Sequence, residues 1–272
     1  MVWDIKVLYF GHLTSKKGNN TPGYDDDLIL DTPYLGFLLR NGKENVLVDT
    51  GIHERFFAGG EAWGGGTAVG GASYVVKALA KEGLKCEDID TVIYTHLHND
   101  HAGNCDLFPD ALAIWQKDEM LNLLNPLPSQ LIRRDYDLEA VAPLKALKNI
   151  CEVNGDVELP NGLKLIKTPS HTLGHMSVWV PTNDGPRVLV GDFCSRSYFL
   201  FPEMEELLQA DGSVVKITPL PHDVSPIYPH TLVYDHYAFY DSYYKIKSLI
   251  PAWEPKYLVC GHDSALLYTG IL

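Results

Sequence analysis

The segment THLHNDHAG, residues 95–103, brings histidine and aspartate side chains together at a spacing that could bind metal ions. His96 and His98 point to the same side of an extended chain, because side chains two residues apart share a face. Asp100 and His101 follow once the chain turns, so they can face a second ion beside the first. Imidazole and carboxylate ligands without a thiolate suit Zn, Fe or Mn and favour a hydrolytic over a structural site.

Further candidate ligands lie downstream, each after a run of apolar residues. His171 follows LIKTPS, Asp192 follows VLVG, and His262 follows YLVC after one glycine. Sites in α/β proteins gather at strand ends, because rigid strands hold the geometry while loops leave access. We therefore expect these side chains to converge with the first group. A carboxylate such as Asp192 can then bridge two ions about 3.5–4 Å apart.

The other histidines are assigned to structure, because an isolated histidine is more often structural than a ligand. His175 lies four residues after His171 and is expected to orient the site. The remaining histidines are expected to be structural: His12, His53, His222, His230 and His236.

Short strands and amphipathic helices must position these residues. Apolar, β-branched runs bounded by turn-forming residues predict strands at 5–10, 34–39, 45–51, 91–96, 112–116, 165–170, 176–181, 187–193 and 257–263. Helical spacing predicts helices at 74–84, 117–124 and 239–250, and in the second half of 126–150. Strands and helices alternate in both halves, so we expect one α/β domain over residues 1–272, with two sheets and helices outside them.

Two segments lack a clear period and are predicted to be loops near the site. Residues 59–73 are the most glycine-dense part of the chain and lack the patterns of a phosphate-binding loop. Residues 195–236 are rich in proline and aromatic residues. We expect both segments to close over a substrate.

Composition and charge limit the partners. The formal net charge of −13 disfavours nucleic acid, whose binding depends on basic side chains. Five widely spaced cysteines without a CxxC pair argue against a disulfide framework. There is neither a recognisable signal peptide nor an apolar run of the about 18 residues that a membrane span needs. We expect a cytoplasmic protein that acts on a small molecule, without a membrane partner.

The motif HLHNDH, with TPSHTLGH, VGD and CGHD downstream, resembles the metallo-β-lactamase superfamily in order and spacing along nearly the whole chain. The resemblance implies an αββα sandwich of two mixed β-sheets flanked by helices, with a dinuclear metal site at one edge of the sheets. It also implies that Asp49, in VLVDTG, supports the site. The implied ligands are His96, His98 and His171 for one ion, Asp100, His101 and His262 for the other, and Asp192 as the bridge.

Within the superfamily, THLHNDHAG, LVDTGIH and the C-terminal GHD are most similar to the quorum-quenching N-acyl homoserine lactonases and their relative 4-pyridoxolactonase. The resemblance implies hydrolysis of a lactone or small ester by a metal-bridging hydroxide. Two divalent ions are expected, zinc first and iron or manganese as alternatives. Asp100 would pass a proton to the leaving alkoxide. Related lactonases include dimers, so a homodimer is a further expectation.

Two departures from this branch bear on the substrate. The lactonases carry a tyrosine three residues after the bridging aspartate, where this chain has Ser195; the nearest tyrosine is Tyr198, which we consider as an oxyanion donor. The 69 residues between Asp192 and His262 also exceed what is usual for the branch. Aromatic residues of this stretch are expected to form a wall over the pocket: Phe199, Phe201, Tyr228, Tyr234 and Tyr237.

Other functions remain open within the same superfamily. The alternatives are a thioester hydrolase of the glyoxalase II type, a phosphodiesterase and a β-lactamase. A redox role is disfavoured, because the diiron relatives have Glu where this chain has His98. Outside enzymes, the alternative is a metal or ligand sensor. The complete set of ligands favours an enzyme over a sensor.

Overall fold

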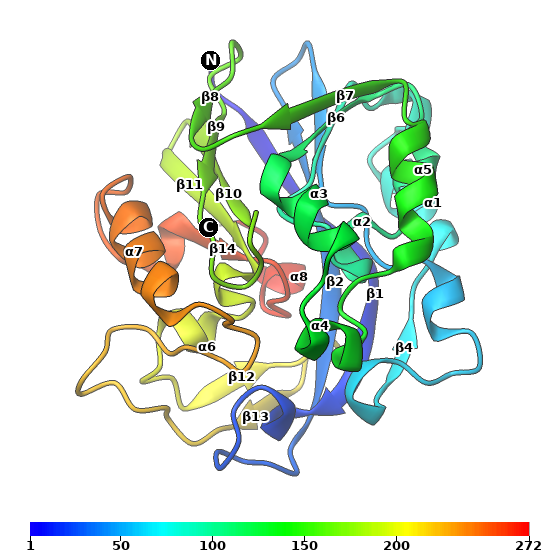
Figure 1. Ribbon diagram of the computed structural model, residues 1–272. Coiled ribbons are helices and arrows are strands. Elements are labelled where there is room, and N and C mark those ends of the chain that lie inside the picture. The colour runs from blue at the N-terminus through cyan, green and yellow to red at the C-terminus, as the bar shows by residue number, and fades with distance from the viewer. Residues whose placement is uncertain (272) are drawn as a thin grey trace.

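The structure, a computed structural model, describes residues 1–271, and two β-sheets face each other at its centre (Figure 1). The strands of the larger sheet, in spatial order, are β4 (Thr67–Val69), β1 (Asp4–Lys16), β2 (Ile29–Arg40), β3 (Asn45–Val48), β5 (Thr91–Ile93), β6 (Leu112–Gln116) and β7 (Asn149–Val153). Those of the smaller sheet are β14 (Leu258–Cys260), β11 (Gly185–Gly191), β10 (Met176–Thr182), β9 (Lys164–Lys167) and β8 (Val157–Glu158).

Both sheets are mixed. In the larger sheet, β1, β2 and β3 pair antiparallel, whereas β3, β5, β6 and β7 run parallel to one another. In the smaller sheet, β8 to β11 pair antiparallel and β14 runs parallel to β11. Because parallel neighbours share the direction of their carboxyl ends, the loops after β3 and β5 leave the same edge of the larger sheet.

The central strands are buried on both faces, which explains their continuous apolar sequences. Val46 and Val48 of β3 belong to the core between the sheets, whereas Leu47 belongs to the core on the other face of the larger sheet. The same alternation places Ile93 of β5 between the sheets and Val92 on the other face. A strand of this kind requires a layer on each side, which the sandwich supplies.

Helices form the two outer layers (Figure 1). On the larger sheet, α1 (Ala72–Lys81), α3 (Lys117–Leu124) and α5 (Val141–Ala146) contribute buried apolar side chains to one core. On the smaller sheet, α6 (Ser197–Leu200) and α7 (His236–Lys247) contribute to another. Over the described residues no helix combines the length and apolar character that a membrane crossing requires. Because helices cover the outer face of each sheet, the predicted αββα arrangement is confirmed.

Most predicted elements are present, with shifted ends. The helix at 117–124 matches α3, and the helix predicted at 239–250 begins earlier, at His236. Strand β1 continues past its predicted end at residue 10, because a register shift between Tyr9 and His12 accommodates Gly11 at φ +118°. The prediction for 126–150 is correct only for α5, since it missed α4 (Pro128–Arg133) and β7.

Residues 195–236 hold structure that the sequence pattern did not reveal. Strands β12 (Glu206–Leu208) and β13 (Val214–Lys216) pair antiparallel as a small separate sheet. The buried side chains that follow join the core beneath α7: Ile217, Leu220, Ile227 and Val233. This burial favours a fixed wall over a hinged lid.

Candidate metal centre

The predicted ligands come together from both sheets, as the strand-end argument predicts. Each follows a strand closely: His96, His98, Asp100 and His101 follow β5, with the last two on the short helix α2 (Asn99–Ala102); His171 follows β9; Asp192 follows β11; and His262 follows β14. Strands far apart in the sequence therefore meet at one site.

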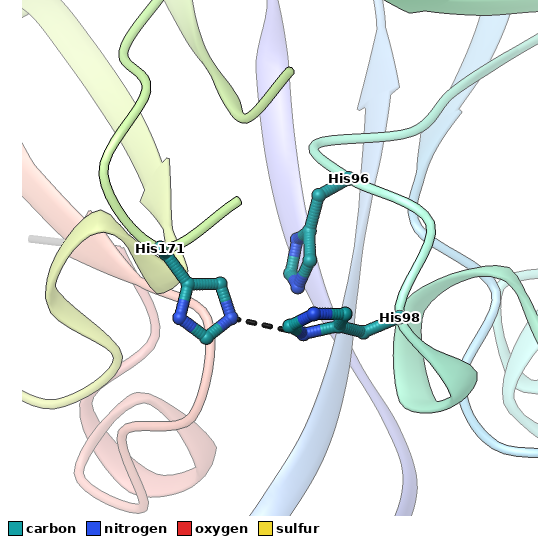
Figure 2. A group of neighbouring side chains, drawn as sticks. All are labelled: His96, His98 and His171. Atoms are coloured by element: carbon teal, nitrogen blue, oxygen red, sulfur yellow. Dashed lines mark hydrogen bonds between the residues drawn. The ribbon is translucent and has the colours of Figure 1, made fainter. Parts of the chain in front are cut away.

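The first ligand group contains three histidines. One nitrogen each from His96, His98 and His171 lies within 4.8 Å of the other two. Figure 2 shows the three rings pointing toward one another, with His171 Nε2 3.0 Å from His98 Nδ1. Burial and the neighbouring imidazoles hold the pKa of each ring well below its usual value. Neutral imidazoles whose lone pairs converge are the ligands that a transition-metal ion requires.

The second group adds carboxylates. Asp100, His101 and His262 offer atoms within 4.8 Å of one another, and the Nε2 atoms of the two histidines are 3.2 Å apart. Asp192 extends to both groups, since its Oδ1 lies 3.2 Å from His262 Nε2 and its Oδ2 lies 3.5 Å from His171 Nε2. One carboxylate between two clusters of nitrogen atoms is the arrangement that bridges a pair of ions.

Hydrogen bonds fix the ring orientation of four ligand histidines. In each, Nδ1 donates to an oxygen: His96 to Thr95 Oγ1 (3.1 Å), His101 to Asp49 Oδ2 (2.9 Å), His171 to the Leu232 carbonyl (3.0 Å) and His262 to the Pro33 carbonyl (2.7 Å). With the proton on Nδ1, the lone pair on Nε2 is left for a cation. His96 Nε2 is accordingly buried without a hydrogen-bond partner.

The charge of the second group also fits a cation. Burial disfavours the His101 imidazolium, but the carboxylates of Asp100, Asp49 and Asp192 outweigh burial and raise the pKa of His101 to about 10. A proton held so strongly occupies a place where positive charge is strongly stabilised. A divalent cation there would replace the proton, so the residues fit two metal ions in both donor type and electrostatics.

Asp49 holds the two groups together, in agreement with the support role expected for it. Its carboxylate accepts hydrogen bonds from Thr95 N and Thr95 Oγ1, both at 2.8 Å, and from His101 Nδ1. The Asp49 backbone adopts φ +63°, which is uncommon for a residue with a side chain. This strained position after β3 places the carboxylate against both ends of the segment 95–101, at Thr95 beside His96 and at His101.

His175 orients the bridge, as the sequence analysis predicted. Its Nε2 accepts hydrogen bonds from the backbone N–H groups of Asp192 (3.1 Å) and Phe193 (3.2 Å). Gly191 leaves the room for this contact, because a Cβ there would lie 2.8 Å from His175 Nε2. His175 thus positions the Asp192 backbone, and it is absent from the metal-binding groups that the described residues form.

Glu119 is an important residue that the sequence reasoning missed. It is fully buried on α3, and its carboxylate accepts hydrogen bonds from two ligand-bearing loops. The donors are Leu97 N (3.0 Å), Gly174 N (3.0 Å), Tyr136 Oη (2.8 Å) and Thr172 Oγ1 (2.6 Å). Leu97 separates two ligands and Thr172 follows a third, so one carboxylate connects both loops. Glu119 follows Asp118 in the first turn of α3, and acids are common at that place in a helix, so the sequence offers no pattern that would reveal this role.

A cavity that is partly open to solvent lies against the metal-ligand groups. Of the predicted ligands, it is lined by His98, Asp100, His171, Asp192 and His262. An apolar part of the lining comes from β1 and the segment after β3: Leu13, Ile52, Phe56, Ala62 and Trp63. The glycine-dense segment 59–73 therefore does border the site.

The other predicted loop segment, residues 195–236, contributes Ser195, Arg196 and Leu232 to the cavity lining and none of the five aromatic residues expected there. The expectation of an aromatic wall is therefore wrong. Phe199 is buried in the core under α7, and Tyr237 is 90% exposed. Tyr198 is fully buried and absent from the cavity lining, with its hydroxyl 3.1 Å from Arg196 Nη1. This placement gives no support to Tyr198 as an oxyanion donor.

Comparison with known sequences agrees with this geometry. The model of the Metallo-beta-lactamase superfamily matches residues 33–196. The chain is 31% identical to an N-acyl homoserine lactonase of Bacillus thuringiensis over 197 residues, which cover 68% of this chain and 74% of the relative. It is 27% identical to the N-acyl homoserine lactonase AiiB of Agrobacterium fabrum (strain C58 / ATCC 33970) over 186 residues, covering 58% and 67%.

Solved structures share the fold. An N-acyl homoserine lactone hydrolase with the product N-hexanoyl-L-homoserine bound at its catalytic metal centre superposes with a TM-score of 0.72 at 21% identity, covering 97% of this chain and 94% of that one. AidC, a dizinc quorum-quenching lactonase, superposes with a TM-score of 0.58 at 17% identity, covering 74% of each chain.

Proposed function

The chain belongs to the metallo-beta-lactamase superfamily, and from this premise we propose that it is a dinuclear-metal hydrolase that opens lactones or small esters. The observation that supports this most is the position of Asp192 between two groups of histidine ligands. The sequence relatives named N-acyl homoserine lactonases support ring-opening of a lactone as the reaction.

The ligand residues divide between two ions. His96, His98 and His171 would hold one, Asp100, His101 and His262 would hold the other, and Asp192 would bridge them. Two bound divalent cations supply a hydroxide at neutral pH and polarise an ester carbonyl. We propose zinc, because neutral imidazole and carboxylate suit it and a structural relative is described as dizinc; iron and manganese accept the same ligands.

Asp100 is the ligand best placed to act on the substrate. Its side chain is 23% exposed, whereas those of His101 and His262 are 1% and 5% exposed. It lines the cavity, with Oδ2 3.5 Å from His262 Nε2. A carboxylate that touches both the centre and the cavity can hand a proton to the alkoxide that leaves when the ester bond breaks.

The cavity wall would position the remainder of the substrate. The side chains of Ile52, Phe56 and Trp63 offer an apolar surface beside the ligands. Pockets for small ligands combine such a surface with a few polar groups that fix orientation. An acyl chain attached to the lactone ring is the substrate part that this surface fits.

A pH-indicator assay on the metal-loaded protein tests the proposal. The substrates are N-hexanoyl homoserine lactone, γ-butyrolactone, an S-acyl thioester and a bis-aryl phosphate. We expect proton release with the lactones that stops after chelation. Turnover confined to the thioester or the phosphate diester would overturn the proposal and leave the metal centre in place with another reaction.

A further inference from the structure

Arg196 is a buried cation on the wall of the cavity without an acidic partner. Its exposed fraction is 7%, and it lines the cavity beside Asp192 and His262. Among the residues that the structure describes, no carboxylate oxygen lies within 4.0 Å of its guanidinium nitrogens. Other arginines do have such partners: Arg40 with Glu82 at 2.9 Å, Arg55 with Asp137 at 2.6 Å and Arg133 with Asp135 at 3.6 Å.

Neutral hydroxyl groups hold the Arg196 side chain in place. Nη1 donates to the Tyr198 hydroxyl at 3.1 Å, and Nη2 donates to Thr32 Oγ1. Of the five N–H groups of a guanidinium, these contacts use two. Asp263 lies farther away, and its carboxylate accepts hydrogen bonds from Ser197 N and Ser197 Oγ. The positive charge of Arg196 is therefore oriented but not neutralised by a direct ion pair.

Asn20 adds a second polar group to the same cavity. Its exposed fraction is 7%, and its Oδ1 is buried without a hydrogen-bond partner. Thr32, which accepts from Arg196, also lines the cavity. We call Asn20, Thr32 and Arg196 the polar corner. An amide and a guanidinium left with unused hydrogen-bonding capacity beside a cavity indicate a ligand that uses both.

An unpaired buried charge is costly, and the cost is offset when a counter-ion binds. A guanidinium fork matches a carboxylate with two parallel hydrogen bonds. Rotation of the Asn20 amide by about 180° would place Nδ2, a donor to the same carboxylate, where Oδ1 now lies without a partner. We propose that the polar corner binds a carboxylate of the substrate, separate from the ester that is cleaved. The inference rests on the proposed lactonase function and predicts that, among its lactone and ester substrates, those that carry a carboxylate are preferred.

The metal centre cannot supply this counter-charge. Asp100 and Asp192 belong to the ligand groups, so their charges are committed to the ions there. The carboxylate that hydrolysis creates forms at the cleaved ester, next to those ligands. A neutral acyl amide is the competing ligand, since its carbonyl oxygen could accept one hydrogen bond from Arg196. The two ligands differ in charge, so a pair of substrates with the same ring, one charged and one neutral, distinguishes them.

The test compares 5-oxotetrahydrofuran-2-carboxylate with γ-butyrolactone, which has the same ring and no carboxylate. We expect kcat/KM of the wild-type protein to be higher for the carboxylated lactone by about tenfold or more, and Arg196→Met to reduce this ratio by about 10- to 100-fold, chiefly through KM. Arg196→Lys keeps the charge without the fork and should give an intermediate ratio. Asn20→Ala is an independent variant that should also lower the ratio.

Arg40→Met is the matched control, because Arg40 forms an ion pair with Glu82 at 2.9 Å and does not line the cavity. Its substrate ratio should stay within about twofold of wild type. Hydrolysis of both lactones without a preference, or with the same preference in Arg196→Met, would overturn the inference and leave the lactonase function standing. Higher activity on N-hexanoyl homoserine lactone that depends on Arg196 would assign the corner to the amide and overturn it as well.

Hydrolysis of neither lactone would count against the proposed function, and the corner is then tested by binding alone. Calorimetry with 2-hydroxyglutarate, the ring-opened product, would compare the metal-loaded wild-type protein with Arg196→Met. Weaker binding by about tenfold or more in the variant supports the inference. Equal affinity contradicts it. Metal content and thermal unfolding of each variant confirm that the comparison is between folded, loaded proteins.

Discussion

The ligand-bearing loops and the segment 195–236 both border the cavity, but they are built differently. The loops leave strands that are buried on both faces, and buried carboxylates join them to one another. The segment contains a small separate sheet and is held mainly by apolar packing under α7. It reaches the cavity with Ser195, Arg196 and Leu232.

This difference separates two tasks. The loops position charged ligands, where a small displacement changes every distance to an ion. Apart from the Leu232 carbonyl, which holds the His171 ring, the segment and the apolar wall would contact what lies beyond the reacting ester, where a change alters affinity for one substrate over another. Substitutions in the loops should therefore change metal binding and kcat, whereas substitutions in the walls should change KM and substrate preference.

The largest effect is expected at the bridge. Asp192→Ala removes the carboxylate that lies between both groups, so activity should fall by at least about 10³-fold and the protein should hold fewer than two ions. Metal analysis and initial rates measure both changes. Asp211→Ala, at an exposed aspartate, is the control and should keep both. A variant at Asp192 with two ions and full turnover would remove the basis for the dinuclear centre.

A smaller effect is expected where the loops are joined. Glu119→Gln keeps the shape but replaces an oxygen that accepts hydrogen bonds with an NH₂ group that cannot. Two of the donors then face a donor, so metal affinity should fall by about 10- to 100-fold and unfolding free energy by about 1–3 kcal/mol. Competition with a chelator and urea unfolding provide the measurements. Glu139→Gln, whose side chain is 81% exposed, is the control. An unchanged metal affinity would show that the loops hold their geometry without Glu119.

The apolar wall should affect KM. Trp63→Ala removes a large ring from the lining, so KM for N-decanoyl homoserine lactone should rise by about tenfold, since burial of apolar surface contributes to binding. The KM for γ-butyrolactone, which has no acyl chain, should change little, and two ions should remain bound. Equal changes in KM for both substrates would mean that Trp63 supports the metal centre rather than the acyl chain. The wall would then not differ in task from the ligand-bearing loops.

The smallest effect is expected at Tyr198. Its hydroxyl lies against Arg196 and the residue does not line the cavity, so Tyr198→Phe should change kcat for γ-butyrolactone by less than about threefold. Removal of a true oxyanion donor would lower kcat by about 10²- to 10³-fold. A loss of that size would mean that the Tyr198 hydroxyl stabilises the oxyanion. Segment 195–236 would then contribute a group to the reaction itself.

The same two regions differ in how far their structure could be predicted. The supporting role of Asp49 was implied by the resemblance to the superfamily, and the place of His175 four residues after His171 suggested its orienting role. Residue type, spacing and the apolar strands before them predict the metal ligands that the structure brings together. Their geometry depends on local chain direction and on strands whose burial leaves a clear pattern.

The rest depends on contacts between distant residues. Glu119 meets loops on both sheets, and no local pattern records which loop a helix will touch. Phe199 and Tyr198 illustrate the opposite error, because aromatic residues near an active site in sequence were expected at its wall and are buried in the core instead. Strands β12 and β13 have three residues each, too few for a periodic signal.

Titration of metal-free protein with Zn²⁺, with lactone hydrolysis followed at each step, tests the central claim most directly. The ligand geometry predicts that activity is absent without metal and rises until about two equivalents are bound per chain. The substrates are N-hexanoyl homoserine lactone, γ-butyrolactone and 5-oxotetrahydrofuran-2-carboxylate. Full activity of the metal-free protein, or two bound ions with no turnover of any lactone, would contradict the assignment of a dinuclear lactonase.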